Sequence, residues 1–214
     1  MQEGTNMCAR YLTFEAWKDA VFFEIAPYTQ ARPAARQIRP ADLAPVFVQK
    51  DGHVSAEAMR WGFPMQRSAV IFNARAETLE EKNLFRDAYR LRRCLVPAAG
   101  FYEWNSQSGE RCFFRGRENE ILYMAGIYQE KAEDSRFVIV TTRACAPVSE
   151  VHMRMPLVLH AGQAIQWLGN MEQAERLRSS AHIVPLIQEP AAEFLHPVQQ
   201  YKRNVGRAGS YDRV

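Results

Sequence analysis

Four residues of this sequence have the side chains needed for chemistry on an aldehyde, namely Cys8, Asn73, Glu103 and His152. Inside a chain, Cys8 would be an ordinary small buried side chain. At the start of a chain, one cysteine carries both an α-amine and a thiol. The amine can condense with an aldehyde, and the thiol can then close a five-membered thiazolidine ring. The chemistry of Cys8 therefore depends on whether it becomes the first residue.

Asn73 and Arg75 stand directly before a segment that is expected to be helical. Residues in this position often do no more than cap and solvate the helix. A fixed amide and a guanidinium beside the free N–H groups of a helix end could equally hold a phosphate or a sugar. The two residues are therefore candidates for binding as well as for capping.

Glu103 lies in the sequence GFYEW. Strand alternation puts it on the same face as Phe101, opposite Tyr102 and Trp104. A carboxylate on an apolar face is costly to bury unless it is paired or used, and a raised pKa there would suit acid or base catalysis. His152 stands beside a loop, where most histidines are ordinary polar residues, but only histidine titrates unaided near neutral pH. In one pocket, the four groups would form a site for carbonyl chemistry.

The composition is that of an ordinary globular domain. The chain has 214 residues and a mass of 24.6 kDa, with 47% hydrophobic and 24% charged residues, which excludes disordered, collagen-like and coiled-coil chains. The formal net charge is +3, from 27 Lys and Arg against 24 Asp and Glu. Attraction to a polyanion must therefore come from local clusters of charge. No apolar run approaches the roughly 20 residues of a membrane-spanning helix.

Cysteines and histidines give no sign of a metal site or a disulfide framework. They are scattered without C-x-x-C or H-x-x-x-H spacing, at Cys8, Cys94, Cys112, Cys145, His53, His152, His160, His182 and His196. Structural zinc would need clustered ligands, so we expect no metal. Scattered thiols fit a reducing cytosol. Because the first residues also lack the apolar run of a signal peptide, we expect a cytoplasmic protein.

The elements that must position these groups begin with a helix and a loop. Apolar spacing predicts a helix over Thr13 to Ile25. The prolines and arginines of Tyr28 to Pro45 predict a basic extended loop on the surface. Glu77 to Tyr89 is expected to be a second helix, because acidic residues stand in its first turns.

Short β-like runs separated by turns dominate the rest of the chain. Asp51-Gly52 favours a tight turn between two of them. The expected strands are Pro45 to Lys50, Val54 to Gly62, Arg93 to Pro97, Gly100 to Asn105, Arg111 to Arg115, Ile121 to Tyr128, Phe137 to Thr142 and Leu157 to Leu159. Further helices are expected near Gln163 to Leu168 and Glu172 to Ser179. No linker interrupts the chain, so we predict a single α+β domain with a mainly antiparallel sheet or barrel flanked by helices.

Several motifs occur in an order and spacing that are typical of one family. They are MCAR from Met7, WGFP from Trp61, NARAETLEEK from Asn73, RRCLVPAAGFYEW from Arg92, VTT from Val140 and HMRMP from His152. The sequence resembles the SOS-response-associated peptidase (SRAP) family of abasic site processing proteins. The resemblance runs from about Met7 to about Leu159. It implies one domain over residues 1–214, with residues 1–6 as an extension that is not native or is removed.

The resemblance implies a sensor of abasic sites in single-stranded DNA that acts in the DNA damage and SOS response without a cofactor. It implies that Cys8, freed by removal of Met7, attacks the ring-opened deoxyribose aldehyde and forms a stable thiazolidine crosslink between protein and DNA. It also implies that Asn73 holds the sugar or the reacting amine, and that Glu103 moves protons during Schiff-base formation and ring closure. His152 would be the acid or base for the sugar hydroxyl.

The resemblance also implies a surface that holds DNA. Arg10 and Arg75 match positions that hold the DNA backbone, and Thr141 would line the pocket; we add Arg39 and Trp61 to this predicted DNA-binding set. The Tyr-Asn-hydrophobic-Ala-Pro segment of the family, and the tryptophans that follow its W-G-hydrophobic-x-P motif, are absent here. The entry surface for DNA would then depend on basic residues, which are Arg32, Arg36, Arg39 and Arg67.

The six residues before Met7 conflict with this chemistry. Methionine aminopeptidase removes Met only ahead of small residues, so Met1 before Gln2 should remain and Cys8 would have no free amine. Either translation begins at Met7, or the extension is not native, or the protein cuts itself after Met7. A start at Met7 is favoured because MCAR is the usual opening of the family.

Three functions stay open. The first is the crosslinker, for which the family implies additional abasic-site lyase activity by β-elimination and self-cleaving peptidase activity. The second is a peptidase that uses Cys8, Glu103 and His152 on protein without DNA crosslinking. The third is a non-catalytic relative that binds single-stranded DNA. We expect a monomer whose partner is single-stranded DNA with abasic sites, without a membrane, located in the cytoplasm and at the nucleoid when engaged with DNA.

Overall fold

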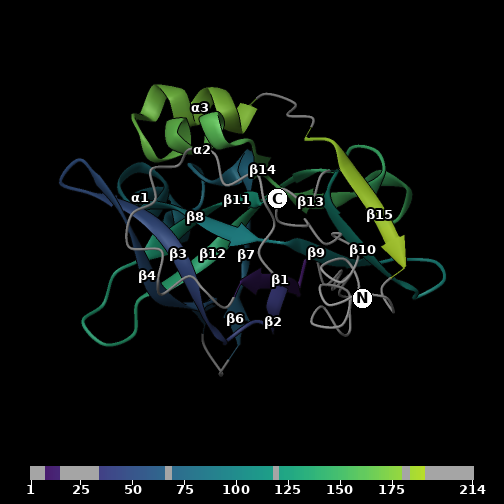
Figure 1. The fold of residues 1–214 in the computed structure, drawn as a ribbon. Helices are drawn as coiled ribbons and strands as arrows, with labels where there is room; N and C mark the ends of the chain where they lie inside the picture. The colour runs from purple at the N-terminus through teal and green to yellow at the C-terminus, as the bar shows by residue number, and fades with distance from the viewer. Residues whose placement is uncertain (1–7, 15–33, 66–68, 118–120, 180–183, 191–214) are drawn as a thin grey trace, which may run out of the picture.

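The computed structural model describes residues 8–14, 34–65, 69–117, 121–179 and 184–190, and strands dominate it (Figure 1). The strands are β1 (Tyr11–Phe14), β2 (Ala34–Ile38), β3 (Leu43–Lys50), β4 (His53–Trp61), β5 (Phe63–Pro64), β6 (Val70–Ile71), β7 (Asn73–Arg75), β8 (Arg93–Ala98), β9 (Gly100–Trp104), β10 (Arg111–Gly116), β11 (Leu122–Gln129), β12 (Arg136–Arg143), β13 (Arg154–Pro156), β14 (Val158–Leu159) and β15 (Leu186–Pro190). The helices are α1 (Asn83–Leu91), α2 (Ala161–Leu168) and α3 (Met171–Ser179), with short 3-10 turns η3 (Ala76–Thr78) and η4 (Val148–Glu150). The predicted α+β class is confirmed.

Five strands close into a ring, because β12 pairs with both β4 and β11, the two ends of the run β4-β3-β8-β11. The pairing of β12 with β4 is parallel, and the other pairings around the ring are antiparallel. Side chains alternate along each strand. Val46 and Val48 belong to the cluster inside the ring, whereas Phe47 between them belongs to a second cluster outside it.

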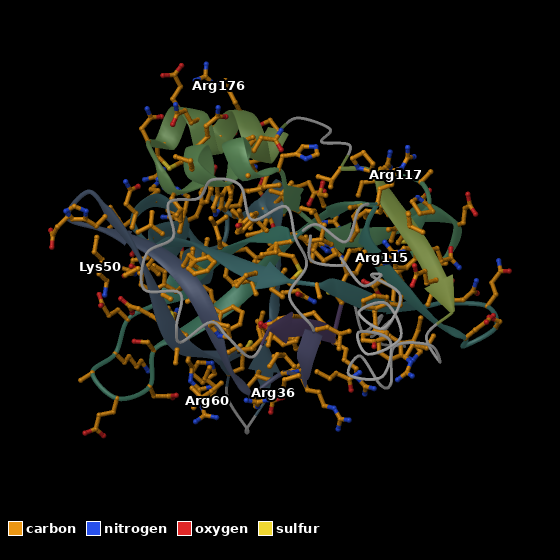
Figure 2. All side chains as sticks on the ribbon, viewed as in Figure 1. Arg36, Lys50, Arg60, Arg115, Arg117 and Arg176 are labelled. Carbon is orange, nitrogen blue, oxygen red and sulfur yellow. The ribbon has the colours of Figure 1, made fainter. Side chains whose placement is uncertain are left out.

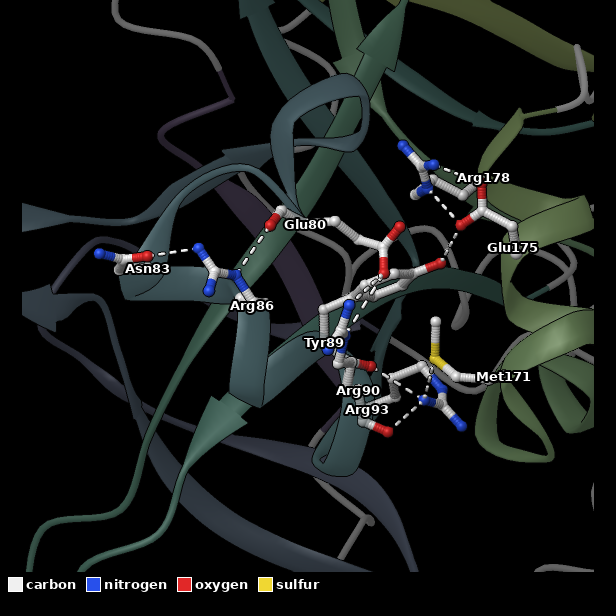
Figure 3. Close-up of polar contacts among 9 residues, drawn as sticks. All are labelled: Glu80, Asn83, Arg86, Tyr89, Arg90, Arg93, Met171, Glu175 and Arg178. Carbon is white, nitrogen blue, oxygen red and sulfur yellow. Dashed lines mark hydrogen bonds and ion pairs between the residues drawn. The ribbon is translucent and has the colours of Figure 1, made fainter.

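The three helices cover the outer face of the ring (Figure 1). Their buried side chains pack in the same cluster as Phe47, and include Phe85, Tyr89, Trp167 and Leu177. The Tyr89 hydroxyl of α1 donates a hydrogen bond to Oε2 of Glu175 in α3 at 3.0 Å, and Glu175 pairs with Arg178 (Figure 3). None of the helices in the described part of the chain is long and apolar enough to cross a membrane.

A second sheet, with the strand order β15-β10-β9-β1-β2, lies against the ring. On its inner face, Tyr11 and Phe101 join the cluster inside the ring, and Cys8 lies in that cluster. On its outer face, Tyr102 forms a separate small cluster against which Trp104 packs. The predicted alternation along GFYEW is therefore confirmed, and Cys8 lies between the second sheet and the ring.

The structure corrects both expectations for the N-terminal region. Thr13, expected to begin a helix, lies in β1, where pairing with β2 provides its backbone partners; residues 15–25 of that expected helix lie outside the described residues. Ala34–Ile38, expected to be loop, forms β2 at the edge of the second sheet. An edge strand tolerates nearby prolines because one of its sides needs no hydrogen bonds.

The expected helix Glu77 to Tyr89 is split, because η3 ends at Thr78 and α1 begins at Asn83. The other predicted strands and helices agree with the structure to within two residues at each end. The hairpin turn has φ of +51° at Asp51 and +80° at Gly52, as the Asp-Gly pair predicted.

Gly100 is required where β9 passes β10, and its replacement should destabilise the fold. A Cβ atom at Gly100 would overlap the Phe113 ring and the carbonyl oxygen of Phe114. We expect Gly100→Ala to lower the free energy of unfolding by about 1–3 kcal/mol. The control is Gly162→Ala in the first turn of α2, where a Cβ meets nothing within 4 Å. Thermal unfolding checks both variants, and equal stability of the two would contradict the close approach.

Candidate active site

Cys8 and Glu103 are joined by a buried hydrogen bond. The backbone N–H of Cys8 donates to Oε1 of Glu103 at 2.9 Å, and both residues are fully buried. Antiparallel pairing sets Tyr11 of β1 opposite Phe101 of β9, which brings the residues just before β1 alongside the end of β9. The nitrogen that would become an α-amine if Cys8 were the first residue therefore faces the carboxyl group.

Burial raises the pKa of Glu103 to about 8. Hydrogen bonds from the backbone N–H groups of Cys8 and Trp104 oppose this effect only in part. Oε2 of Glu103 has no hydrogen-bond partner among the described residues. A carboxyl group in this condition can both give and take a proton near neutral pH, as acid and base catalysis requires.

Burial also raises the pKa of the Cys8 thiol well above its ordinary value, and the charge of an ionised Glu103 raises it further. A hydrogen bond from the backbone of Arg10 acts in the opposite direction. A neutral thiol is a weak nucleophile. If Cys8 is the first residue, its amine is therefore expected to attack before its sulfur, which is the order that thiazolidine formation needs.

Asn73 reaches Cys8 from the other side of the site. It lies on β7, which pairs in parallel with β12 so that Asn73 is opposite Ile139. Its Nδ2 donates a hydrogen bond to the carbonyl oxygen of Cys8 at 3.4 Å. Cys8 therefore contacts both Asn73 and Glu103, so that the structure brings three of the four predicted catalytic residues together.

His152 lies between η4 and β13 and is buried. Its backbone N–H donates to the carbonyl oxygen of Val148 at 2.9 Å. Its Nδ1 accepts a hydrogen bond from the backbone N–H of Arg154 at 3.1 Å and lies 3.0 Å from the carbonyl oxygen of the same residue. The adjacent Val151 belongs to the same buried cluster as Cys8. The imidazole is therefore held in one orientation at the edge of this cluster.

Basic and aromatic side chains alternate on the outer face of the second sheet. The guanidinium of Arg10 lies 5.3 Å from the centroid of the Trp104 ring, and that of Arg111 lies 5.1 Å from the Tyr102 ring. Burial, and then the positive charges of Arg39 and Arg111, lower the pKa of Arg10. These residues therefore form a clustered basic face that the net charge of the chain did not reveal.

Two members of the predicted DNA-binding set do not lie on the surface. Trp61 is fully buried, and its indole N–H donates to the carbonyl oxygen of Phe72 at 2.8 Å. Thr141 is fully buried, and its hydroxyl lies 3.5 Å from the carbonyl oxygen of Ala74. We therefore assign both residues a supporting position on either side of Asn73. Arg39 and Arg75 are exposed, as a DNA contact requires.

Tyr102, Trp104 and Arg111 contribute to this face although no binding role was predicted for them from the sequence. The pairing of β9 with β10 sets Trp104 opposite Arg111. The turn-rich SQSGE between the two predicted strands indicated a hairpin, so counting outward from this turn would have found the pair.

The described residues include no group of three or more His, Cys, Asp or Glu side chains that could hold a metal ion. Cys8, Cys94, Cys112 and Cys145 are free thiols.

The raised pKa of Glu103 predicts the pH dependence of stability. Between the ordinary pKa of the unfolded chain and about 8 in the folded chain, the folded state binds the extra proton, so stability should fall as pH rises through this range. Glu103→Gln stays neutral, and we expect it to remove this loss of stability, which reaches about 4 kcal/mol at pH 8. Urea unfolding of the full chain from about pH 5 to pH 8 measures the effect.

Glu110→Gln is the control for this measurement, because it neutralises an exposed carboxylate in the same hairpin. This variant should follow the wild-type dependence on pH. Parallel profiles of wild type and Glu103→Gln would mean that Glu103 is ionised in the folded chain at neutral pH.

Comparison with known proteins gives relatives that share most of the chain. Abasic site processing protein YoaM of Bacillus subtilis is 25% identical over 180 residues, which cover 76% of this chain and 79% of that protein. Abasic site processing protein YedK of Escherichia coli is 25% identical over 193 residues, which cover 86% of each. The crystal structure of a phage-related protein from Bordetella bronchiseptica is similar in fold, with a TM-score of 0.68 and 24% identity over 86% of this chain and 94% of that one.

The family model agrees with these likenesses and with the motifs that hold the site. The model described as SOS response associated peptidase (SRAP) matches residues 7–203. This range contains Cys8, Asn73, Glu103 and His152, together with both sheets and the helical layer. The chain therefore belongs to the SOS response associated peptidase (SRAP) family.

Proposed function

We propose that this protein processes abasic sites in single-stranded DNA by forming a covalent crosslink through Cys8. The hydrogen bond from the Cys8 nitrogen to buried Glu103 carries the proposal. It sets a group that can exchange protons at neutral pH against the atom that must attack the aldehyde. The names of the relatives YoaM and YedK, both abasic site processing proteins, support the choice of substrate.

The proposed chemistry has two bond-forming steps. The amine of Cys8 adds to the aldehyde carbon of the ring-opened deoxyribose, and water leaves as the Schiff base forms. The thiol then adds to the C=N carbon, its proton passes to the nitrogen, and the thiazolidine ring closes. Glu103 takes a proton from the attacking amine and returns one to the departing oxygen. Asn73 holds the Cys8 carbonyl, which fixes the direction of the amine.

His152 is proposed to act on the sugar hydroxyl while the ring opens. The same Schiff base explains the lyase activity, because it acidifies the neighbouring sugar carbon and allows β-elimination of the 3′ phosphate. Closure of the thiazolidine ring competes with this elimination. Self-cleavage after Met7 would expose the amine of Cys8, and would be the peptidase activity of this chain.

The basic face, which consists of Arg10, Arg39 and Arg111 with the rings of Tyr102 and Trp104, is proposed to hold the DNA strand. Aromatic rings stack with bases without regard to sequence, and arginines neutralise phosphates. Arg10 connects this face to the catalytic residues, because it follows Cys8 by two positions and lies over Trp104. We further propose that residues 1–214 act as one monomeric domain, in the cytoplasm and at the nucleoid when engaged with DNA in the damage response.

A crosslinking experiment tests the proposal. A chain starting at Met7 and the full chain of 214 residues are each mixed with a single-stranded oligonucleotide that carries one abasic site. We expect a band that survives denaturing electrophoresis with the shorter chain, because Met7 before a small residue is removed and Cys8 gains its amine. A band with both chains would indicate self-cleavage after Met7. No band with either would contradict the crosslinking proposal.

Cys8→Ala in the chain starting at Met7 separates the amine from the thiol. Alanine also permits removal of Met7, so the amine remains while the ring cannot close. We expect loss of the stable crosslink but retention of a Schiff base that borohydride can trap. If the crosslink survives in Cys8→Ala, another residue is the nucleophile. Turnover of peptides without DNA would support the peptidase alternative, and salt-sensitive binding without a crosslink would support the non-catalytic binder.

The basic face predicts a difference between two exposed arginines. Figure 2 shows Arg36 at the β2 edge, at the opposite end of the molecule from Arg176 on the helical layer. Arg39 lies one residue beyond β2, close in sequence to Arg36, and should contact phosphate. Arg39→Ala is therefore expected to weaken binding to single-stranded DNA about 3- to 10-fold at about 0.1 M salt. It should also reduce the dependence of binding on salt concentration. Arg176→Ala makes the same change of charge and should bind as wild type. Equal losses in a filter-binding titration would exclude a localised face.

A further inference from the structure

Glu77 forms a two-pronged ion pair with Arg154, although the two residues are far apart in the sequence. Nη1 and Nη2 of Arg154 lie 2.6 and 2.9 Å from Oε1 and Oε2 of Glu77. The Arg154 side chain is only 13% exposed, whereas that of Glu77 is 51% exposed. Parallel hydrogen bonds between a guanidinium and a carboxylate fix the direction of both groups. The pair therefore joins η3, just after Asn73, to β13, just after His152.

Arg154 also binds the strand that lies between these segments. Its Nη2 donates to the carbonyl oxygen of Thr141 at 2.8 Å and lies 3.4 Å from the Thr141 hydroxyl. The same hydroxyl lies 3.5 Å from the carbonyl oxygen of Ala74. The guanidinium thus bridges η3 and β12 while its own backbone belongs to β13.

The backbone of Arg154 in turn contacts the imidazole of His152. Its N–H donates to Nδ1 at 3.1 Å, and its carbonyl oxygen lies 3.0 Å from the same nitrogen. A partner at one ring nitrogen sets the orientation of the ring and determines which nitrogen faces the substrate. Any movement of Arg154 would therefore move the imidazole.

The Glu77 end of this chain of contacts is itself anchored. Nη1 of Arg178 in α3 donates to the carbonyl oxygen of Ala76 at 2.7 Å. Arg178 lies over the Tyr89 ring and pairs with Glu175 (Figure 3). The hydrogen bond from Arg154 lowers the pKa of Glu77, which keeps the carboxylate ionised. Glu77 is therefore a fixed anchor rather than a mobile surface carboxylate.

We propose that Glu77 is a positioning residue for His152, and that it acts by holding the Arg154 guanidinium against Thr141. This inference rests on the proposed function, in which His152 acts on the sugar hydroxyl. Glu77 would touch neither substrate nor the reacting atoms. Its effect on the reaction should therefore disappear once the imidazole is removed.

The test is the rate of crosslinking by chains that start at Met7. We expect Glu77→Ala to slow crosslinking about 10-fold, part of the roughly 10²–10⁴-fold typical of an acid or base group. Glu77→Gln keeps one acceptor and should fall between Glu77→Ala and wild type. In a His152→Ala background, Glu77→Ala should change the rate less than about twofold, since contacts that act in series are not additive. Independent, multiplying effects of the two substitutions would overturn the proposal.

Glu80→Ala is the matched control, because Glu80 is a partly exposed carboxylate three positions along that also pairs with an arginine, Arg90, at 3.3 Å (Figure 3). It should crosslink at the wild-type rate, and a loss equal to that of Glu77→Ala would overturn the proposal.

A measurement without DNA separates this inference from the proposed function. In ¹H–¹⁵N spectra of the full chain, the imidazole signals of His152 are assigned by their loss in His152→Ala. We expect them to shift in Glu77→Ala and to stay in place in Glu80→Ala. If wild type forms no crosslink but these signals shift, the proposed function fails and the positioning role stands. Unchanged signals in Glu77→Ala would overturn the positioning role, whatever the crosslinking result.

Discussion

The hydrogen bond between the Cys8 nitrogen and Glu103 is the contact on which the rest of the site depends. It exists because β1 pairs with β9 and because the second sheet closes over the ring of strands. The same burial raises the pKa of the carboxyl group and of the thiol. One packing arrangement thus positions the Cys8 nitrogen against the Glu103 carboxyl group and disfavours ionisation of both the carboxyl group and the thiol, as the proposed function needs.

Strand β12 is the second element that positions residues of the site. It pairs with β7, which carries Asn73, and with β13, which begins at Arg154. The segments near residues 73, 141 and 154 therefore lie on adjacent strands, although they are far apart in the sequence. The ion pair between Glu77 and Arg154 and the buried hydroxyl of Thr141 connect these strands to each other. Arg178 of α3 holds the segment after β7 through the carbonyl oxygen of Ala76. The helical layer is in this way part of the support of the site.

The sequence predicted the antiparallel strands after Arg93 closely, because turn residues separate them and apolar residues fill them. It predicted Thr13 wrongly, since helical spacing over a short stretch cannot reveal that partners in β2 and β9 convert the segment to strand. The motifs indicated Cys8, Asn73, Glu103 and His152. The motifs did not reveal that Trp61 is buried, because its burial depends on the parallel pairing of β4 with β12. They did not reveal the ion pair between Glu77 and Arg154 either, because that contact depends on the parallel pairing of β7 with β12.

Glu103 and Trp104 are neighbours on one strand, yet they serve opposite faces of the second sheet, one toward Cys8 and the other beneath Arg10. Because side chains on a strand alternate with a period of two residues, these assignments cannot change separately. A single inserted or deleted residue before Glu103 within β9 would turn the carboxylate toward solvent and the indole into the core. The positions of the carboxylate and of the aromatic surface are thus coupled, and only substitutions that preserve the length of β9 keep both in place.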